Sequence, residues 1–211
     1  MTIGRAALAA CCLAAAALGI AAVEPATPDI APDAAPSAGP PAGSLLIASA
    51  QIQDPRFYHA VILLVRHTAD GAFGIVVNHP LGEQTIAQLL AAIGDDATGV
   101  DGSIEVFEGG PVQPESGFLI HTAEYRRAAT LAIDGKVALT ASKEALRDIG
   151  HHRGPQKFFF ALGYAGWGAG QLEGELARND WFTLPEDPAL LFAEDPDKVW
   201  DQALARRGQE L

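Results

Sequence analysis

Cysteine is almost missing from this chain of 211 residues, since Cys11 and Cys12 are its two cysteines. The rest of the chain therefore has no internal disulfide, no thiolate nucleophile and no cysteine ligand for a metal. Positive charge is also scarce: from Gly43 onward, 13 lysines and arginines stand against 23 aspartates and glutamates, a formal charge of −10. Such a surface repels phosphate backbones. The adjacent basic pairs Arg126-Arg127 and Arg206-Arg207 are too small to form a patch, so direct nucleic-acid binding is not expected.

The common catalytic signatures are missing as well. The sequence contains no G-x-S-x-G, no H-E-x-x-H and no S-x-x-K pattern, which mark several large classes of hydrolase. Thr140 and Lys143 come nearest to a lysine-activated hydroxyl. Thr140 is better explained as a helix cap, and Lys143 as a surface charge. We therefore expect no recognisable catalytic set, no cofactor and no metal.

An apolar leader opens the chain. Residues 6–23 carry no charge and follow Arg5, which is the layout of a signal peptide. Small residues favour cleavage after Ala21. A second possibility is the lipoprotein box at residues 8–11, which would leave a lipidated Cys11. A third is an uncleaved anchor, although the run is short and rich in alanine for the ~20 residues that a span needs. A fourth is that the leader is not translated.

These alternatives differ in where they place the protein. Export makes it periplasmic or membrane-anchored, with the leader as the expected membrane contact, whereas an untranslated leader leaves it cytoplasmic. Residues 24–42 are rich in alanine and proline, a composition that favours extended conformations and does not fold. The predicted organisation is a leader (1–23), a disordered linker (24–42) and one domain (43–211), whose length suits a single hydrophobic core.

Within the domain, short apolar runs are interleaved with amphipathic segments. Hairpin turns are expected at Asp70-Gly71 and Asp134-Gly135, and Thr85 begins a helix through a capping box with Gln88. Further helices are expected from Thr140, around Leu172 and Leu176, and from Asp195-Pro196. Strands are predicted at residues 44–49, 60–65, 73–78, 104–107, 117–122, 130–133, 137–139 and 158–162. This irregular order favours a mixed, α+β-like α/β fold over a doubly wound parallel sheet.

A long glycine-rich block carries a family resemblance. Residues 154–181 read GPQKFFFALGYAGWGAGQLEGELARNDW and closely resemble the signature of the bacterial YqgE/AlgH family. Supporting matches follow in order at residues 46–48, 54–57, 67, 71–74, 77–80, 109–112, 117–121 and 139–143, so the resemblance spans residues 43–208. It implies a single domain with a curled, partly barrel-like mixed sheet surrounded by helices. The family is linked to transcriptional regulation without an established DNA-binding mechanism, so the resemblance implies no activity. The chain departs from the family pattern at Ala50, Arg66 and His79.

Residues 163–170 form the candidate binding element. As a glycine-rich loop between a strand and a helix, they would resemble the setting in which backbone N–H groups bind anions. They match neither a P-loop nor G-x-G-x-x-G, and Glu173 and Glu175 would oppose a phosphate. We favour the alternative that the glycines allow positive φ and close packing around Trp167. The hypothetical ligand-binding set comprises Asn78, Gly109, Gly110, Pro111, His67, His121, Gly166, Trp167, Gly168 and Gly170.

His67 and His121 each end an expected strand, where a site can form, and neutral histidine can act as a base or a metal ligand. No carboxylate stands at ligand spacing, so the metal signal is weak and a structural role is favoured for both. The leading hypothesis is a non-catalytic binding or regulatory module for a protein partner or a small molecule. A hydrolase-like enzyme that uses His67 or His121 is the alternative, and transcriptional regulation ranks last.

The leader hypothesis predicts that the native protein begins at Ala22 and fractionates with the periplasm, because small residues flank that cleavage point. Mass spectrometry of the N-terminus after cell fractionation measures both properties. A lipidated Cys11 in the membrane fraction, or a cytosolic protein that starts near Val23, would contradict cleavage after Ala21.

Overall fold

A computed structural model describes residues 39–52 and 54–208 of the protein. The predicted leader, Cys11 and the linker up to residue 38 lie outside the described residues. Within the described part of the chain, no helix is both long enough and apolar enough to cross a membrane.

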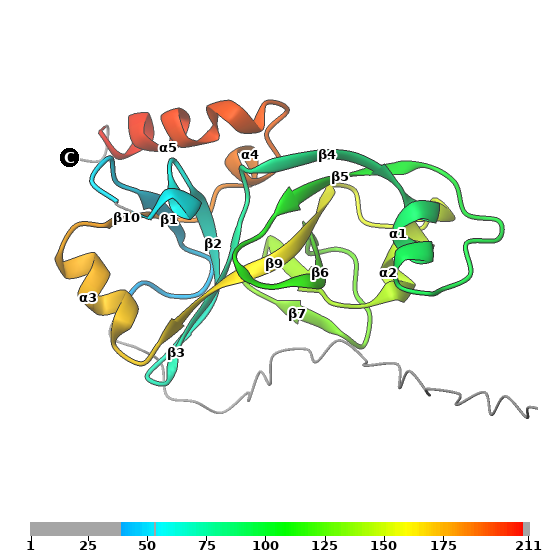
Figure 1. Ribbon diagram of the computed structural model, residues 1–211, viewed down its shortest axis with the longest axis horizontal. Coiled ribbons are helices and arrows are strands. Elements are labelled where there is room, and N and C mark those ends of the chain that lie inside the picture. The colour runs from blue at the N-terminus through cyan, green and yellow to red at the C-terminus, as the bar shows by residue number, and fades with distance from the viewer. Residues whose placement is uncertain (1–38, 53, 209–211) are drawn as a thin grey trace, which may run out of the picture.

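The fold is built on one curled sheet of ten strands (Figure 1). Eight strands follow the order β10-β1-β2-β3-β9-β6-β8-β7, and the β4–β5 ribbon joins β9 through β5. The β5–β9 pairing is parallel, and the other pairings of the described strands are antiparallel, so the sheet is mixed as predicted. The strands are β1 (Leu45–Ala48), β2 (Val61–Thr68), β3 (Gly71–Val76), β4 (Pro80–Thr85), β5 (Ser103–Glu108), β6 (Val112–Thr122), β7 (Thr130–Ala132), β8 (Val137–Thr140), β9 (Phe158–Gly168) and β10 (Trp181–Leu184).

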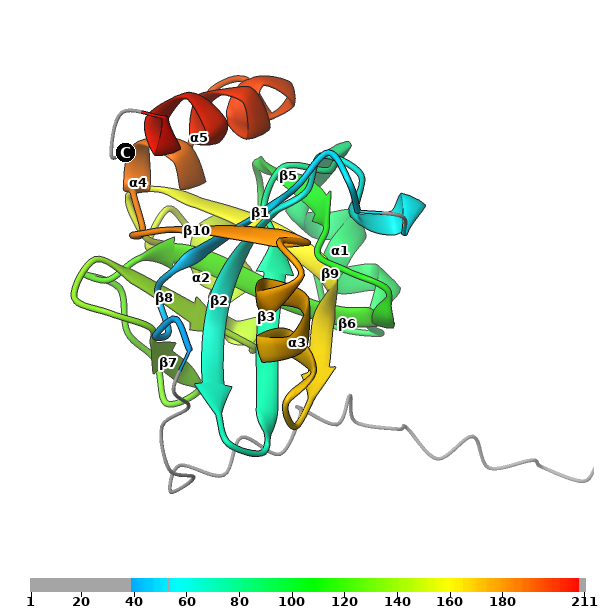
Figure 2. The same cartoon turned by 90° about the vertical axis from the view of Figure 1, so that its left-hand side faces the viewer.

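Short helices surround this sheet. Helices α1 and α2 lie together beyond the β4–β5 ribbon, and α4 and α5 lie together above β1 and β10 (Figures 1 and 2). Helix α3 lies against β3 and β9. The helices are α1 (Ile86–Ala92), α2 (Lys143–Gly150), α3 (Gln171–Ala177), α4 (Pro188–Leu191) and α5 (Val199–Arg207), with 3-10 turns η1 (Pro55–Phe57) and η2 (Pro196–Lys198). The single-domain, curled α/β fold is confirmed.

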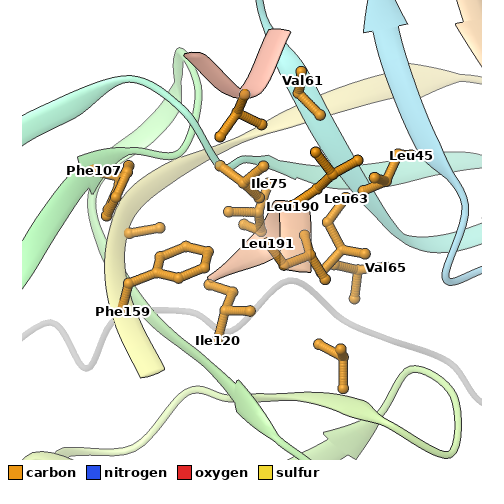
Figure 3. Close-up of a cluster of buried hydrophobic side chains, with 14 of the residues drawn as sticks. Leu45, Val61, Leu63, Val65, Ile75, Phe107, Ile120, Phe159, Leu190 and Leu191 are labelled. Carbon is orange, nitrogen blue, oxygen red and sulfur yellow. The ribbon is translucent and has the colours of Figure 1, made fainter. Parts of the chain in front are cut away.

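The curl gives the sheet an inner face that is packed with aliphatic and aromatic side chains (Figure 3). Because side chains alternate along a strand, Leu63 and Ile75 point into this core whereas Ile62 and Leu64 pack on the outer face, with Trp167 and Trp181. Both faces of β2 are therefore covered, as its continuous apolar run predicts. Leu190 and Leu191 of α4 close the inner core.

Residues 163–168 of the glycine-rich segment are strand, so the predicted loop is wrong there; residues 169 and 170 form the turn before α3. Strand β9 continues to Gly168 and pairs with β3, β5 and β6. Gly163 within β9, and Gly109 and Gly110 just before β6, allow the backbones to approach closely where these strands meet. A Cβ on Gly110 would lie 2.2 Å from the carbonyl carbon of Tyr164, and one on Gly109 would lie 2.4 Å from the oxygen of Gly163.

Two helix starts also differ from the prediction. Thr140 is the last residue of β8 and does not cap α2; Ser142 occupies that position. Thr140 is buried within the sheet, where its hydroxyl has other partners. The last helix begins at Val199 because Pro196–Lys198 form a 3-10 turn after Asp195. The capping box of Thr85 and Gln88 is present as predicted.

Replacing Gly110 should destabilise the fold, because its φ of +145° disfavours side chains and its Cβ would meet the backbone of β9. We expect Gly110→Ala to lower the free energy of unfolding by more than about 2 kcal/mol. Gly135→Ala is the matched control, since a Cβ there meets nothing within 4 Å. Urea unfolding of both variants measures the difference, and equal stabilities would contradict the proposed backbone crowding.

Candidate functional site

The side chain of Asn78, a predicted binding residue, makes hydrogen bonds within the fold. It is buried, its Oδ1 accepts a hydrogen bond from the backbone N–H of Val61 at 2.7 Å, and its Nδ2 donates to the carbonyl of His59 at 2.9 Å. Its side chain thus ties the start of β2 to the residues that follow β3. These two hydrogen bonds give Asn78 a structural role in the fold.

The predicted glycine residues divide into two groups. Gly109 and Gly110 lie near the C-terminal end of β3, where the carbonyl of Gly109 accepts from the N–H of Val76 at 2.9 Å, and Pro111 leads into β6. Gly166 and Gly168 pair with the opposite half of β3, at Phe73 and Gly71. Gly170 begins α3 with φ at +73°. The structure therefore does not gather the predicted set into one pocket.

The indole of Trp167 is held by a carboxylate of α3. Its indole N–H donates to Glu175 Oε2 at 2.8 Å, and the indole of Trp181 donates to the same oxygen at 2.7 Å. Trp167 is 7% exposed, so its ring is covered where it packs on the outer face of the sheet. These contacts fasten α3 to the outer face of the sheet.

His67 also makes internal contacts through both of its ring nitrogens. Its Nδ1 lies 2.9 Å from the carbonyl oxygen of Pro40, and its Nε2 lies 2.9 Å from Glu173 Oε1. Both ring nitrogens face oxygen acceptors, and 1% of the side chain is exposed. The ring therefore links the residues before β1 to α3, and neither nitrogen faces a substrate.

His121 belongs to a buried hydrogen-bonded chain. Its Nδ1–H donates to the carbonyl of Thr122 at 2.9 Å, so Nε2 accepts from the Thr140 hydroxyl at 2.8 Å. Thr130 in turn donates to the Thr140 oxygen at 2.7 Å. Burial lowers the pKa of His121, which agrees with a neutral ring. A general base must reach its substrate, and His121 is 0% exposed.

The described residues also contain no group of three or more histidines, cysteines, aspartates or glutamates that could hold a metal ion.

A different cluster lies where the two ends of the curled sheet meet. Lys136, in the turn between β7 and β8, places its Nζ 3.1 Å from Glu186 Oε2, just after β10. Asp134, in the same turn, accepts from the backbone N–H groups of Lys136 and Val137 at 2.7 and 2.8 Å. Because strands β10 and β7 are the ends of the strand order, these contacts close a seam. We call the meeting residues Asp134, Lys136, Glu186, Asp187 and Arg206 the seam cluster.

The two neighbouring carboxyl groups of the seam cluster differ in proton affinity. Burial, together with a hydrogen bond to Asp134, raises the pKa of Glu186, and the nearby Lys136 ammonium only partly opposes this. Burial also opposes ionisation of Asp134, but its backbone donors and Glu186 outweigh that effect and lower the pKa of Asp134. Such a separation is typical of two carboxyl groups that compete for one proton.

A cavity of about 280 Å³ opens at this seam. We call it the seam pocket. Glu186 lines it with 3% of its side chain exposed, and no described residue donates a hydrogen bond to its Oε1. Arg206 of α5 forms an ion pair with Asp187 at the same cavity. The lining residues are Lys136, Leu184, Pro185, Glu186, Asp187, Pro188, Leu190 and Arg206.

Sequence reasoning missed the seam pocket, and none of the predicted binding residues lines it. The one local feature of the sequence that could have pointed to this pocket is the segment Pro185-Glu186-Asp187-Pro188, in which prolines flank two acidic residues. Its partners, Lys136 and Arg206, are 50 and 20 residues away along the chain. Only the curl of the sheet brings the three segments together.

Comparisons with known proteins agree on one family. A family model described as AlgH-like matches residues 45–211. A UPF0301 protein of Rhodospirillum rubrum is 42% identical over 166 residues, covering 79% of this chain and 86% of that protein. One from Methylococcus capsulatus is 40% identical, covering 80% and 92%.

Two solved structures are also similar. The solution structure of the AlgH protein from Pseudomonas aeruginosa matches with a TM-score of 0.66 and 38% identity, over 78% of this chain and 87% of that one. A crystal structure of a Corynebacterium diphtheriae protein matches with a TM-score of 0.63 and 20% identity, over 80% and 87%. The second match supports the fold alone.

Glu186→Gln should stabilise the protein at neutral pH. A carboxyl whose pKa is raised on folding contributes most stability below its unfolded pKa and loses that contribution as pH rises through the folded value. Glutamine does not titrate, and its amide can still accept from Lys136 and donate to Asp134. We expect the variant to be more stable than the wild type near pH 7 by about 1 kcal/mol, with the difference shrinking as the pH falls.

Denaturant unfolding between pH 4 and pH 8 measures this difference. Glu194→Gln removes the same charge from an exposed residue and is the control for the loss of charge alone. A Glu186→Gln variant whose advantage vanished at high pH and grew at low pH would contradict the raised pKa.

Proposed function

The chain belongs to the AlgH-like family, and we propose that this member is a non-catalytic binding module that holds a partner at the seam pocket. The partner is a protein or a small molecule, and the pocket replaces the glycine-rich segment as the proposed site. Occupation of the pocket would connect the β10–α4 segment, the β7–β8 turn and α5, because all three contribute lining residues.

One observation carries this proposal: no described residue donates a hydrogen bond to the buried Oε1 atom of Glu186, which lines the cavity, and the neighbouring Asp134 carboxylate can only accept one. Leaving a buried polar atom unpaired costs free energy, and such atoms are few in folded proteins. A donor brought by a partner would remove that cost. Asp95 Oδ2 is also without a hydrogen bond among the described residues, but it lies 3.8 Å from the ammonium of Lys143.

Binding is supported over catalysis by the chemistry of the lining. The eight lining residues supply carboxylates, cations and apolar side chains, and they include no hydroxyl, thiol or imidazole. His67 and His121, the candidates for an enzyme, use both ring nitrogens in internal hydrogen bonds. Neither side chain is open to a substrate, so the geometry does not favour the hydrolase-like alternative.

A regulatory role is compatible with the same site. A ligand that binds only the folded state stabilises it in proportion to the logarithm of its concentration. An occupant of the seam pocket would contact both ends of the sheet at once. Partner binding would therefore stabilise the contacts that close the seam.

Site-specific photocrosslinking tests the proposed site. A benzophenone amino acid replaces Pro185, an exposed residue of the pocket lining, in the full chain expressed in its native cells. A second protein carries the same probe at Ile93, which is 56% exposed at the end of α1 and far from α5 in Figure 1. Captured molecules are identified by mass spectrometry, purified and titrated calorimetrically against the wild type, Glu186→Gln and Glu194→Gln.

We expect a partner that crosslinks at position 185 but not at position 93. Loss of a charge-assisted hydrogen bond should weaken its binding to Glu186→Gln by roughly tenfold or more, whereas Glu194→Gln should bind normally. Equal capture at both positions, or a partner whose affinity ignores Glu186, would rule out the seam pocket as the binding site.

A further inference from the structure

Negative charge is in excess at the seam pocket. Three carboxylates, those of Asp134, Glu186 and Asp187, face two cations, Lys136 and Arg206. Each cation already has a carboxylate partner, since Lys136 pairs with Glu186 and Arg206 pairs with Asp187. When Glu186 is ionised, the site therefore has three negative charges and two positive charges, and one more cation would neutralise it.

The remaining walls of the pocket are apolar. Leu184, Pro185, Pro188 and Leu190 supply them. Such walls suit the methylene stem of a lysine or arginine, whose charged head lies at the polar end. A volume of about 280 Å³ is at the small end for ligand pockets, and fits one side chain better than an extended molecule.

Building on the proposed function, we propose that the seam pocket receives a single basic side chain of a protein partner, whose N–H group donates to Glu186 Oε1. The stem of that side chain would pack between the prolines and leucines. The domain's formal charge of −10 from Gly43 onward would also accelerate the approach of a basic partner.

An anionic or neutral occupant fits the same geometry less well. An anion would have to take Lys136 or Arg206 away from carboxylates that they already contact, and would lie beside a carboxylate oxygen that receives no hydrogen bond from a described residue. A neutral donor could bond to Oε1 but would leave the excess negative charge in place. A cation satisfies the hydrogen bond and the charge together.

Binding of a cation would compete with a proton. When Glu186 is protonated, it hydrogen-bonds to Asp134; when the basic side chain enters, that proton leaves to solvent and the ligand N–H takes its place at the carboxylate. One proton is released for each protonated site that binds a cation. Affinity should therefore rise with pH as Glu186 loses its proton, with Asp134, Lys136, Asp187 and Arg206 as the other charged groups that face it.

The test uses peptides and the ¹⁵N-labelled full chain. The probes are blocked pentapeptides, Ac-Ala-Ala-X-Ala-Ala-NH₂, in which X is arginine, lysine, citrulline or glutamate. Citrulline is the matched control because it has the shape of arginine and no charge. NMR titrations follow the amide signals of Lys136, Leu184 and Glu186, and the spectra also report whether each variant is folded.

We expect the arginine and lysine peptides to shift these signals, and citrulline to bind roughly tenfold more weakly. Glu186→Gln should lose the preference for the cation and its pH dependence, whereas Glu194→Gln should keep both. Lys136→Met removes an internal cation that competes for Glu186, so it should bind the basic peptides more tightly. A variant that had merely lost its fold could not show that gain.

Citrulline or glutamate peptides that bind as tightly as arginine would overturn the cation proposal and leave the binding module intact. Basic peptides that fail to shift the pocket signals would overturn it in the same way. The proposed function itself fails by a different result, the absence of any Glu186-dependent partner crosslinked at position 185.

Discussion

The close approach of three strands to β9 determines the shape of this protein. One half of β9 pairs with β5 and β6, and the other half pairs with β3. Backbones can meet there because residues 109, 110 and 163 have no side chains to separate them, and Gly163 takes a φ of +73°. A bend at a glycine within a strand re-aims its two halves. Gly163 of the glycine-rich segment, together with Gly109 and Gly110, thus allows the curl, and the curl brings distant segments of the chain together.

Closure of the curled sheet places polar groups where the core ends. The inner face is filled by aliphatic and aromatic side chains, and beyond them the β7–β8 turn meets the residues that follow β10. At this seam, hydrogen bonds and two ion pairs replace apolar contacts. Glu186 is buried there beside Asp134, so its carboxyl group holds its proton more strongly than an exposed glutamate does. The chemistry of the seam pocket follows from that burial.

Local patterns in the sequence predicted much of the fold. The apolar run of β2, the turn at Asp70-Gly71 and the capping box at Thr85 each act within a few residues, and the structure contains all three. Strand β4 was missed because its residues are exposed throughout, so it has no alternation of apolar and polar residues. The segment 163–170 was misjudged because glycine usually marks a turn, whereas here it relieves backbone crowding inside a strand.

The candidate site was less accessible to sequence reasoning, for a physical reason. Glycines, Asn78 and two histidines were singled out by residue type and position, yet their hydrogen bonds are made inside the fold. Glu186 and Lys136 are common residues, and what distinguishes them is a contact between positions 50 residues apart. Such a contact depends on sheet closure, which no local pattern encodes.

Carboxyl ¹³C NMR gives the most direct test of the paired, buried carboxyl groups at the seam. Glu186 should titrate at a higher pH than a glutamate in an unstructured peptide, and Asp134→Asn should bring the pKa of Glu186 closer to the ordinary glutamate value, because the competing carboxylate is gone. Titration of Glu186 at the ordinary glutamate value in the wild type would contradict the closed seam and the pocket that depends on it.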